Sequence, residues 1–304
     1  MSGATLTLCL SHAPGYARDS EGQYGLEFRK GLQQAIDIVR EFAPTLVVVF
    51  GSDHRKAYAD IVPAMSVVLS AEGLGDLLSP TGPYDVPKAL AKELAEFLVA
   101  EGLDVAVTRH IALDHGFGQM VGVLLGSLDA VPTVPVFINC ATFPLTAPSR
   151  SVELGEAVGR FFERVADQRI LFLASGGLSH SPPTLALVDE PISDEEGAKI
   201  SAAHREAAMD LIRPDWDAQF LANLASTDTA WASRLTQAEI DPAGVGANEV
   251  RTWLAAYAAG GRPMRTVAYE VVRMWVTGMG IAVSEVTGTE VNGTEVTGAE
   301  AVAS

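Results

Sequence analysis

The sequence predicts an α/β protein in which helices cover a central sheet, folded as a single domain with a helical C-terminal part. Two observations lead to this prediction. Short apolar runs typical of buried strands alternate with segments of helical periodicity, and no stretch rich in Pro, Gly or Ser divides them. The chain has 304 residues, of which 48% are hydrophobic, so it can bury a large core without disulfide bonds.

The first elements form a βαβ unit. A β-rich apolar run at residues 5–10 predicts a strand, and apolar residues at helical spacing over 28–42 predict a helix. Pro44 then separates this helix from a second buried strand at 46–50. The pattern leaves open whether the sheet is parallel throughout.

The later elements continue the alternation. Pro87 fits the first turn of a helix at 86–100, and Ser151 fits the N-cap of an amphipathic helix at 151–165. Further strands are predicted at 105–107, 135–139 and 170–174, and further helices at 195–212, 216–225 and 247–259.

The last part of the chain has a different composition. Residues 282–304 repeat short units of Val, Thr, Gly and Glu, a low-complexity pattern typical of a disordered acidic tail. We therefore expect one folded domain over residues 1–281 and a tail over 282–304.

Charge and hydropathy exclude several classes of function. The net charge is −17, and an acidic surface disfavours binding to nucleic acid or to anionic membranes because phosphate needs basic partners. No apolar stretch reaches the length of about 20 residues that spans a bilayer, and the N-terminus lacks the pattern of a signal peptide. The two cysteines form no CxxC motif. These features predict a cytoplasmic protein that binds neither nucleic acid nor membranes.

Four of the six histidines follow predicted strands. His12 and His54 come after the first two strands, His180 follows the strand at 170–174, and His115 follows the run at 105–107. Ligands of open α/β sheets bind beyond the carboxyl ends of the strands. We therefore expect these four side chains to share one pocket.

Three residues are the candidate ligands of a divalent metal ion. His12 and His54 offer nitrogen atoms early in the fold, and Glu249 offers a carboxylate at the start of a helix that follows a glycine-rich turn. Two histidines and one carboxylate suit a ferrous or zinc ion with open coordination positions. Spacing alone fits an exposed Glu249 in a first helical turn equally well. Asp53 and Asp114, each beside a histidine, compete as ligands or as partners of the histidines.

Several strings of residues resemble the class III extradiol catechol dioxygenases. Asp-His-Gly-Phe at 114–117 and Gly-Gly-Leu-Ser-His at 176–180 are the specific ones. The likeness runs from residue 5 to about residue 280. The weaker strings lie at 9–14, 52–54, 134–139, 216–220 and 248–253.

This resemblance implies roles for the individual residues. His12, His54 and Glu249 would bind Fe(II), while His115 would donate and His180 would accept a proton during ring cleavage. A histidine suits proton transfer near neutral pH because its ordinary pKa is about 6.5. Asp114 would orient His115 and stabilise its imidazolium form. A turn-capping role explains Asp114 equally well from the sequence alone.

The resemblance also implies an activity. It is the Fe(II)-dependent extradiol cleavage of a catechol by O2 in aromatic compound catabolism, by a homo-oligomer whose residues 1–281 form the catalytic domain. The nearest likeness is to dioxygenases that act on 3-substituted catechols such as 2,3-dihydroxyphenylpropionate. Three alternatives stay open, namely another catechol such as protocatechuate or gallate, a zinc-dependent hydrolase, and a non-catalytic homologue.

A carboxylated substrate would need a basic partner. Arg109, Arg150 and Arg251 are the candidates, because a guanidinium group matches a carboxylate in geometry. Exposure to solvent is the simpler explanation of each of the three.

Overall fold

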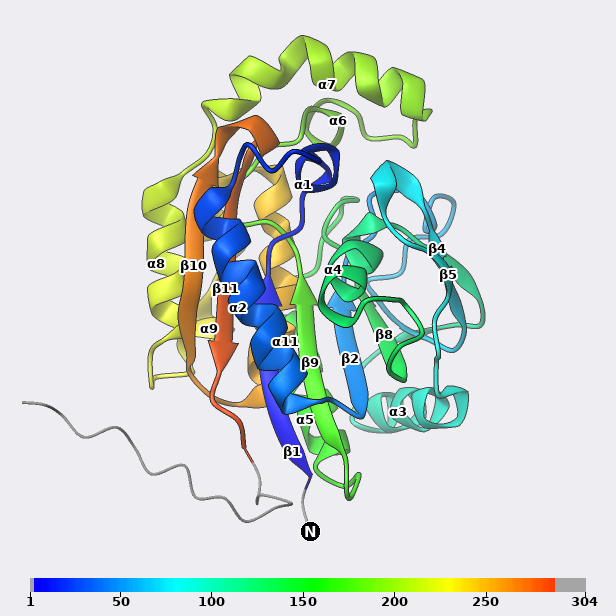
Figure 1. Cartoon of the computed structure of the whole chain (residues 1–304). Coiled ribbons are helices and arrows are strands. Elements are labelled where there is room, and N and C mark those ends of the chain that lie inside the picture. Colours follow the sequence, from blue (N-terminus) through cyan, green and yellow to red (C-terminus); the bar gives the residue numbers. More distant parts are fainter. Residues whose placement is uncertain (1–2, 288–304) are drawn as a thin grey trace, which may run out of the picture.

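An eight-stranded mixed sheet forms the centre of the molecule (Figure 1). The computed structural model describes residues 3–287. The strands of the sheet are β1 (Ala4–Leu10), β2 (Leu46–Gly51), β3 (Met65–Val68), β6 (Ala106–Thr108), β8 (Thr133–Ile138), β9 (Arg169–Ser175), β10 (Met264–Val272) and β11 (Thr277–Ser284). Their order across the sheet is β10-β11-β1-β9-β2-β8-β3-β6.

The four strands at the centre of the sheet are parallel. β1 pairs with β9, β9 with β2, and β2 with β8 in parallel register, whereas β11 joins β1 and β3 joins β8 in antiparallel register. Strands buried on both faces need apolar residues along their whole length, as in the fully buried β2. Because β1, β9 and β2 run in one direction, the segments that follow them emerge at the same edge of the sheet.

Helices cover both faces of the sheet (Figure 1). α2 (Leu26–Phe42) and α4 (His115–Leu125) pack on one face, and their buried residues share one hydrophobic cluster. The other face carries α3 (Lys88–Ala100), α5 (Pro148–Phe162), α8 (Pro214–Leu224) and α11 (Val250–Gly260).

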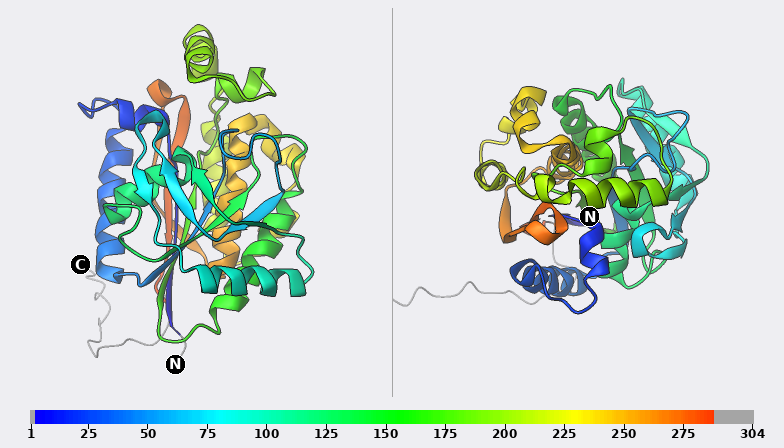
Figure 2. Two further views of the ribbon diagram at one scale, coloured as in Figure 1. Left: turned by 90° about the vertical axis from the view of Figure 1, so that its right-hand side faces the viewer. Right: turned by 90° about the horizontal axis from the view of Figure 1, so that it is seen from above.

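Three helices lie beyond the carboxyl edge of the central strands. They are α1 (Pro14–Arg18), α6 (Pro183–Leu187) and α7 (Asp194–Met209). α7 crosses the top of the molecule in Figures 1 and 2. A capping box between Ser193 and Glu196 starts α7, which explains why a polar segment forms a helix there.

A second sheet of three short strands lies beside the main one. It consists of β4 (Ala71–Leu74), β5 (Thr81–Pro83) and β7 (Ile111–Leu113). The single turn η1 (Asp76–Leu78) connects β4 to β5, and β7 runs directly to the start of α4. Because β4 pairs with β7, this sheet brings the turn η1 close to the N-terminus of α4, although the two are far apart in the sequence.

The remaining elements are single turns and short helices. They are α9 (Trp231–Arg234), α10 (Gln237–Ile240), η2 (Asp241–Ala243), η3 (Val245–Glu249) and η4 (Arg273–Trp275). No helix within residues 3–287 is long and apolar enough to cross a bilayer.

The predicted fold class is confirmed, with corrections to single elements. Ser151 is not an N-cap, because α5 already begins at Pro148, whose fixed backbone angle and missing N–H suit a first helical position. The predicted helix at 247–259 divides into the turn η3 and α11. After its helical segments the chain returns to the sheet as β10 and β11. β11 runs past the boundary expected at residue 281, and residues 288–304 of the predicted tail lie outside the described residues.

Candidate active site

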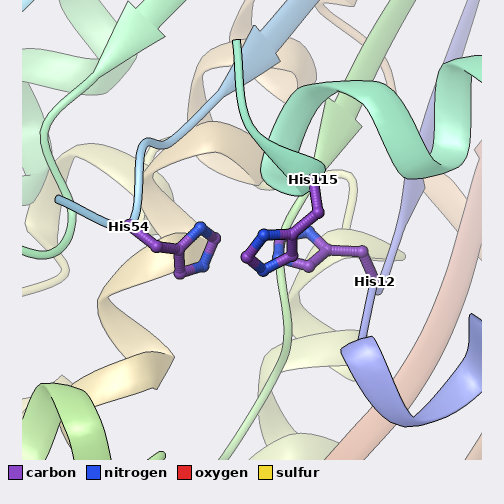
Figure 3. A group of neighbouring side chains, drawn as sticks. All are labelled: His12, His54 and His115. Carbon is purple, nitrogen blue, oxygen red and sulfur yellow. The ribbon is translucent and has the colours of Figure 1, made fainter. Parts of the chain in front are cut away.

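The four histidines that follow strands line a single cavity of about 800 Å³ at the carboxyl edge of the sheet. Figure 3 shows His12, His54 and His115 pointing toward one another from the end of β1, the end of β2 and the start of α4. The ring centroids of His54 and His115 are 4.3 Å apart, and that of His12 lies 5.2 Å and 5.4 Å from them. His180 completes the lining from the segment after β9.

Glu249 lies beside the rings of His12 and His54 and is only 2% exposed. Its Oε1 is 2.9 Å from His54 Nε2 and 3.5 Å from His12 Nε2. Its Oε2 accepts a hydrogen bond of 2.6 Å from the backbone N–H of Gly177. Burial by itself would raise the pKa of the Glu249 carboxyl, but the neighbouring imidazoles hold it well below its usual range. The residue is therefore a buried carboxylate, and the alternative of an exposed residue in a first helical turn is wrong.

The second nitrogen of each imidazole is held by another side chain. His12 Nδ1 is 2.9 Å from the hydroxyl of Ser175, and His54 Nδ1 is 2.8 Å from Asp114 Oδ2. Both Nε2 atoms are thereby turned toward Glu249 Oε1. Burial lowers the pKa of His12 to about 3, so its ring is neutral and has a lone pair to offer. Burial by itself would lower the pKa of His54, but Asp114 and Glu249 raise it, so this ring would release a proton when it binds a metal ion. Two imidazole nitrogens and one carboxylate oxygen around one point suit a divalent metal ion.

The structure corrects the expected partner of Asp114. The carboxylate accepts hydrogen bonds from the backbone N–H and Nδ1 of His54, both at 2.8 Å, whereas His115 Nδ1 is 3.8 Å away. Its other oxygen accepts from the backbone N–H of Gly116 and caps α4. Asp114 therefore orients His54 and caps a helix at the same time, and it does not orient His115.

His115 has a different carboxylate partner, Asp76, which the sequence did not reveal. Asp76 Oδ2 lies 2.7 Å from His115 Nδ1, and Asp76 Oδ1 accepts a hydrogen bond of 2.8 Å from the backbone N–H of His115. Asp76 belongs to the short turn η1, which has neither a periodic pattern nor a motif that would mark it as functional.

His180 is fixed by the backbone. Its Nδ1 lies 2.8 Å from the carbonyl oxygen of Leu178, and its Nε2 faces Glu249 Oε2 at 3.7 Å. Gly246 and Gly177 allow the ring this position, because a Cβ on either residue would come within 2.3 Å and 2.6 Å of ring atoms. A carbonyl oxygen can only accept, so Nδ1 carries a proton, and in the neutral ring the lone pair is on Nε2.

The buried carboxylate of Asp217 holds the segment that carries His180 in place. Asp217 accepts hydrogen bonds of 2.7 Å from the backbone N–H of Ser179, from the Ser179 hydroxyl and from the Tyr269 hydroxyl. Burial raises the pKa of Asp217 although these donors oppose the rise. The three bonds connect α8 and β10 to the residue before His180.

We expect the Asp217→Ala substitution to lower the free energy of unfolding by about 3 kcal/mol, because it leaves the donors of Ser179 and Tyr269 without an acceptor. Urea denaturation of both proteins measures the loss. Asp215→Ala removes an exposed carboxylate from the same helix and serves as the control. Equal unfolding free energies for wild type and Asp217→Ala would contradict this structural role.

The arginines proposed from the sequence do not line the cavity. Arg251 is fully buried and donates to the Thr146 carbonyl and to Asn248 Oδ1, so it is not available to a substrate. Arg150 pairs with Glu153 on α5, and Arg109 is exposed outside the cavity. Basic residues that do line the cavity are Arg18, Arg55, Lys56 and Arg205.

The other polar candidates have local partners. Asp53 accepts hydrogen bonds from the backbone N–H groups of Lys56, Ala57 and Tyr58, so it shapes the turn after His54. His110 is exposed, lies near Glu72 and does not line the cavity.

Comparison with known proteins gives the family. Residues 6–283 match the model of the catalytic LigB subunit of aromatic ring-opening dioxygenase. Three similar proteins bear the name 2,3-dihydroxyphenylpropionate/2,3-dihydroxicinnamic acid 1,2-dioxygenase. Those from Rhodococcus sp and Rhodococcus jostii are 35% and 34% identical over 91% of this chain and 97% of their own. That from Photorhabdus laumondii is 34% identical over 90% of this chain and 95% of its own. The chain therefore belongs to the LigB family of class III extradiol dioxygenases and is an extradiol ring-cleavage dioxygenase.

Proposed function

We propose that this enzyme uses Fe(II) and O2 to open a 3-substituted catechol that bears a short carboxylated side chain, such as 2,3-dihydroxyphenylpropionate. The observation that carries the proposal is the approach of Glu249 Oε1 to the Nε2 atoms of His12 and His54. These three residues would hold the ion and leave coordination positions for the two catechol oxygens and for O2. When bound, Fe(II) would supply Lewis acidity and a path for electrons from the deprotonated catechol to O2. We place this reaction in the cytoplasmic breakdown of aromatic compounds.

His180 would act as the proton acceptor. A catechol must lose protons before both of its oxygens can bind a metal ion. The Nδ1 proton of His180 is committed to the Leu178 carbonyl, so Nε2 is the atom that can take a proton from a hydroxyl group in the cavity.

His115 would act as the proton donor. Cleavage of the bond between the two oxygen atoms leaves one of them with negative charge, which a nearby protonated imidazole can neutralise. A carboxylate at Nδ1 stabilises positive charge on the ring, and His115 has Asp76 at this position, whereas His180 has a neutral carbonyl. This difference supports the assignment of donor and acceptor.

The basic residues of the cavity support an anionic side chain on the substrate. Arg55 donates to the carbonyl oxygens of Val188 and Ala141, and Arg205 donates to that of Met274. Arg18, at the end of α1, makes no hydrogen bond or ion pair with any residue in the described range 3–287. Its guanidinium group is therefore the candidate partner of the substrate carboxylate.

We expect Arg18→Ala to raise the KM for 2,3-dihydroxyphenylpropionate roughly tenfold, the effect of losing a charge-assisted contact of about 1.4 kcal/mol. The KM for the uncharged 3-methylcatechol should not change. Steady-state oxygen uptake with both substrates measures the difference, and Arg262→Ala removes an exposed cation outside the cavity as the control. An equal change for both substrates would show that Arg18 does not bind the carboxylate.

Anaerobic reconstitution tests the proposal as a whole. The metal-free protein is loaded with Fe(II) or with Zn(II), and a panel of catechols is then added in air while oxygen uptake and visible absorbance are recorded. We expect oxygen uptake and a yellow ring-opened product only with Fe(II), with the highest kcat/KM for catechols carrying a carboxylated 3-substituent and a lower one for 3-methylcatechol. Preference for protocatechuate or gallate would contradict the substrate assignment, and lack of oxygen uptake with every catechol would contradict the function.

A further inference from the structure

Asp76 uses both of its carboxylate oxygens on the same residue, His115. Oδ1 accepts the backbone N–H at 2.8 Å, and Oδ2 lies 2.7 Å from Nδ1 of the ring. The two side chains are only 5% and 4% exposed. The backbone N–H belongs to the first turn of α4 and has no acceptor within the helix, so Asp76 satisfies this group while it holds the ring.

The backbone around Asp76 is strained. Gly75 before it has φ 76°, and Leu77 and Leu78 after it have φ 49° and 67°, a region that residues with a Cβ rarely occupy. Such a leucine conformation is unfavourable and persists only where surrounding contacts hold it. Here the Ser79 N–H donates to the Asp76 carbonyl, and the Ser79 hydroxyl donates to Oδ1. Leu77 lines the cavity. A strained turn kept at the edge of the active site indicates a functional constraint on this segment.

The nearby carboxylates already accept hydrogen bonds from the two histidines. Asp76, Asp114 and His115 lie close enough together to resemble a metal site. However, Asp114 Oδ2 already accepts two hydrogen bonds from His54, and both oxygens of Asp76 accept from His115. The cluster is therefore a network that fixes two imidazole rings.

We propose that Asp76 is a positioning residue that keeps the proton of His115 on Nδ1 and directs Nε2 into the cavity. The proposal rests on the role of His115 as proton donor in the proposed function. A carboxylate is needed here because His115 presents two donors, its backbone N–H and Nδ1, and each needs an acceptor oxygen. A carboxylate has two such oxygens, whereas an amide has only one.

The number of acceptor oxygens predicts how Asp76→Asn changes the protonation of the His115 ring. The backbone N–H of His115 can only donate, so the amide oxygen turns toward it and the NH2 group faces Nδ1. Nδ1 must then accept, and the proton of the neutral ring moves to Nε2. The variant keeps the shape of the site and changes the tautomer.

Turnover gives the first measurement. We expect Asp76→Asn to lower kcat by about 10²–10⁴-fold, the usual contribution of a positioned acid or base, with KM within about threefold of wild type and an unchanged iron content. Glu72→Gln is the matched control, since Glu72 lies 3.9 Å from His110 on the same small sheet but outside the cavity. Wild-type kcat in Asp76→Asn would overturn the proposal.

The tautomer itself gives a second measurement, which needs neither metal nor turnover. Long-range ¹H–¹⁵N correlation spectra of the metal-free protein, labelled with ¹⁵N in histidine, report which ring nitrogen carries the proton. His115→Gln identifies the signals of His115. We expect a proton on Nδ1 in wild type and none there in Asp76→Asn.

The two measurements separate the proposal from the function on which it rests. If wild type cleaves no catechol, the proposed function fails, and the tautomer still decides whether Asp76 fixes the ring. If Asp76→Asn does not fold, the wild-type spectrum decides alone. A bare Nδ1 in wild type, or the same tautomer in both proteins, would overturn the inference.

Discussion

The Glu249→Gln variant is expected to lose its metal ion and with it all measurable ring cleavage. Glutamine keeps the size of the side chain but removes the negative charge that balances the ion. Its NH2 group must also face either the Gly177 N–H, which needs an acceptor, or the two Nε2 atoms, where a metal ion would need an oxygen ligand. Loss of a residue that merely orients a metal ligand costs about 10–100-fold in affinity, so loss of the carboxylate ligand should cost at least about 100-fold.

Metal analysis after Fe(II) loading and desalting checks this prediction. Glu153→Gln removes an exposed carboxylate of α5 and should retain a full complement of iron. A Glu249→Gln protein that keeps its iron would mean that another group supplies the third ligand.

The metal-ligand candidates could be found from the sequence because each stands at a position that the fold class makes special. His12 and His54 directly follow β1 and β2, and parallel neighbouring strands end at one edge of the sheet. Glu249 was harder to find. Its Cβ packs closely against Gly176, and a side chain at position 176 would block this contact. This packing brings Glu249 next to the histidines.

Hydrogen-bond partners could not be assigned from neighbours in the sequence. Asp114 stands next to His115, yet its carboxylate turns back over the helix start to reach His54, on a segment far away in the chain. Asp76 reaches His115 only because β4 and β7 pair in the small sheet. Such pairing depends on short strands that carry no hydrophobic pattern of their own, so Asp76 had no signal in the sequence.

Each residue of the Asp-His-Gly-Phe string at 114–117 has its own structural role. Asp114 caps α4, and His115 points its ring into the cavity. A Cβ at Gly116 would lie 2.5 Å from the Ser52 carbonyl oxygen. Phe117 fills the space beside Gly51, where a Cβ would come within 2.7 Å of its ring. The motif therefore packs the start of α4 against the end of β2 and sets the distance between His54 and His115.

The His115→Gln variant is expected to keep its iron while kcat falls by about 10²–10⁴-fold, because glutamine cannot deliver a proton as an imidazolium does. Oxygen uptake under saturating catechol and metal analysis of the same sample measure the two quantities. His110→Gln, which changes an exposed histidine outside the cavity, should behave as wild type. Full turnover in His115→Gln would contradict the acid role.

Iron retention in His115→Gln also decides between two possible ligand sets. The nitrogen atoms of His12, His54 and His115 lie within 4.8 Å of one another, so distance alone permits a site of three histidines. The position of Glu249 favours it over His115, since Glu249 Oε1 faces the Nε2 atoms of both His12 and His54. Loss of iron from His115→Gln together with retention in Glu249→Gln would reverse this assignment, because the ion would then depend on the ring and not on the carboxylate.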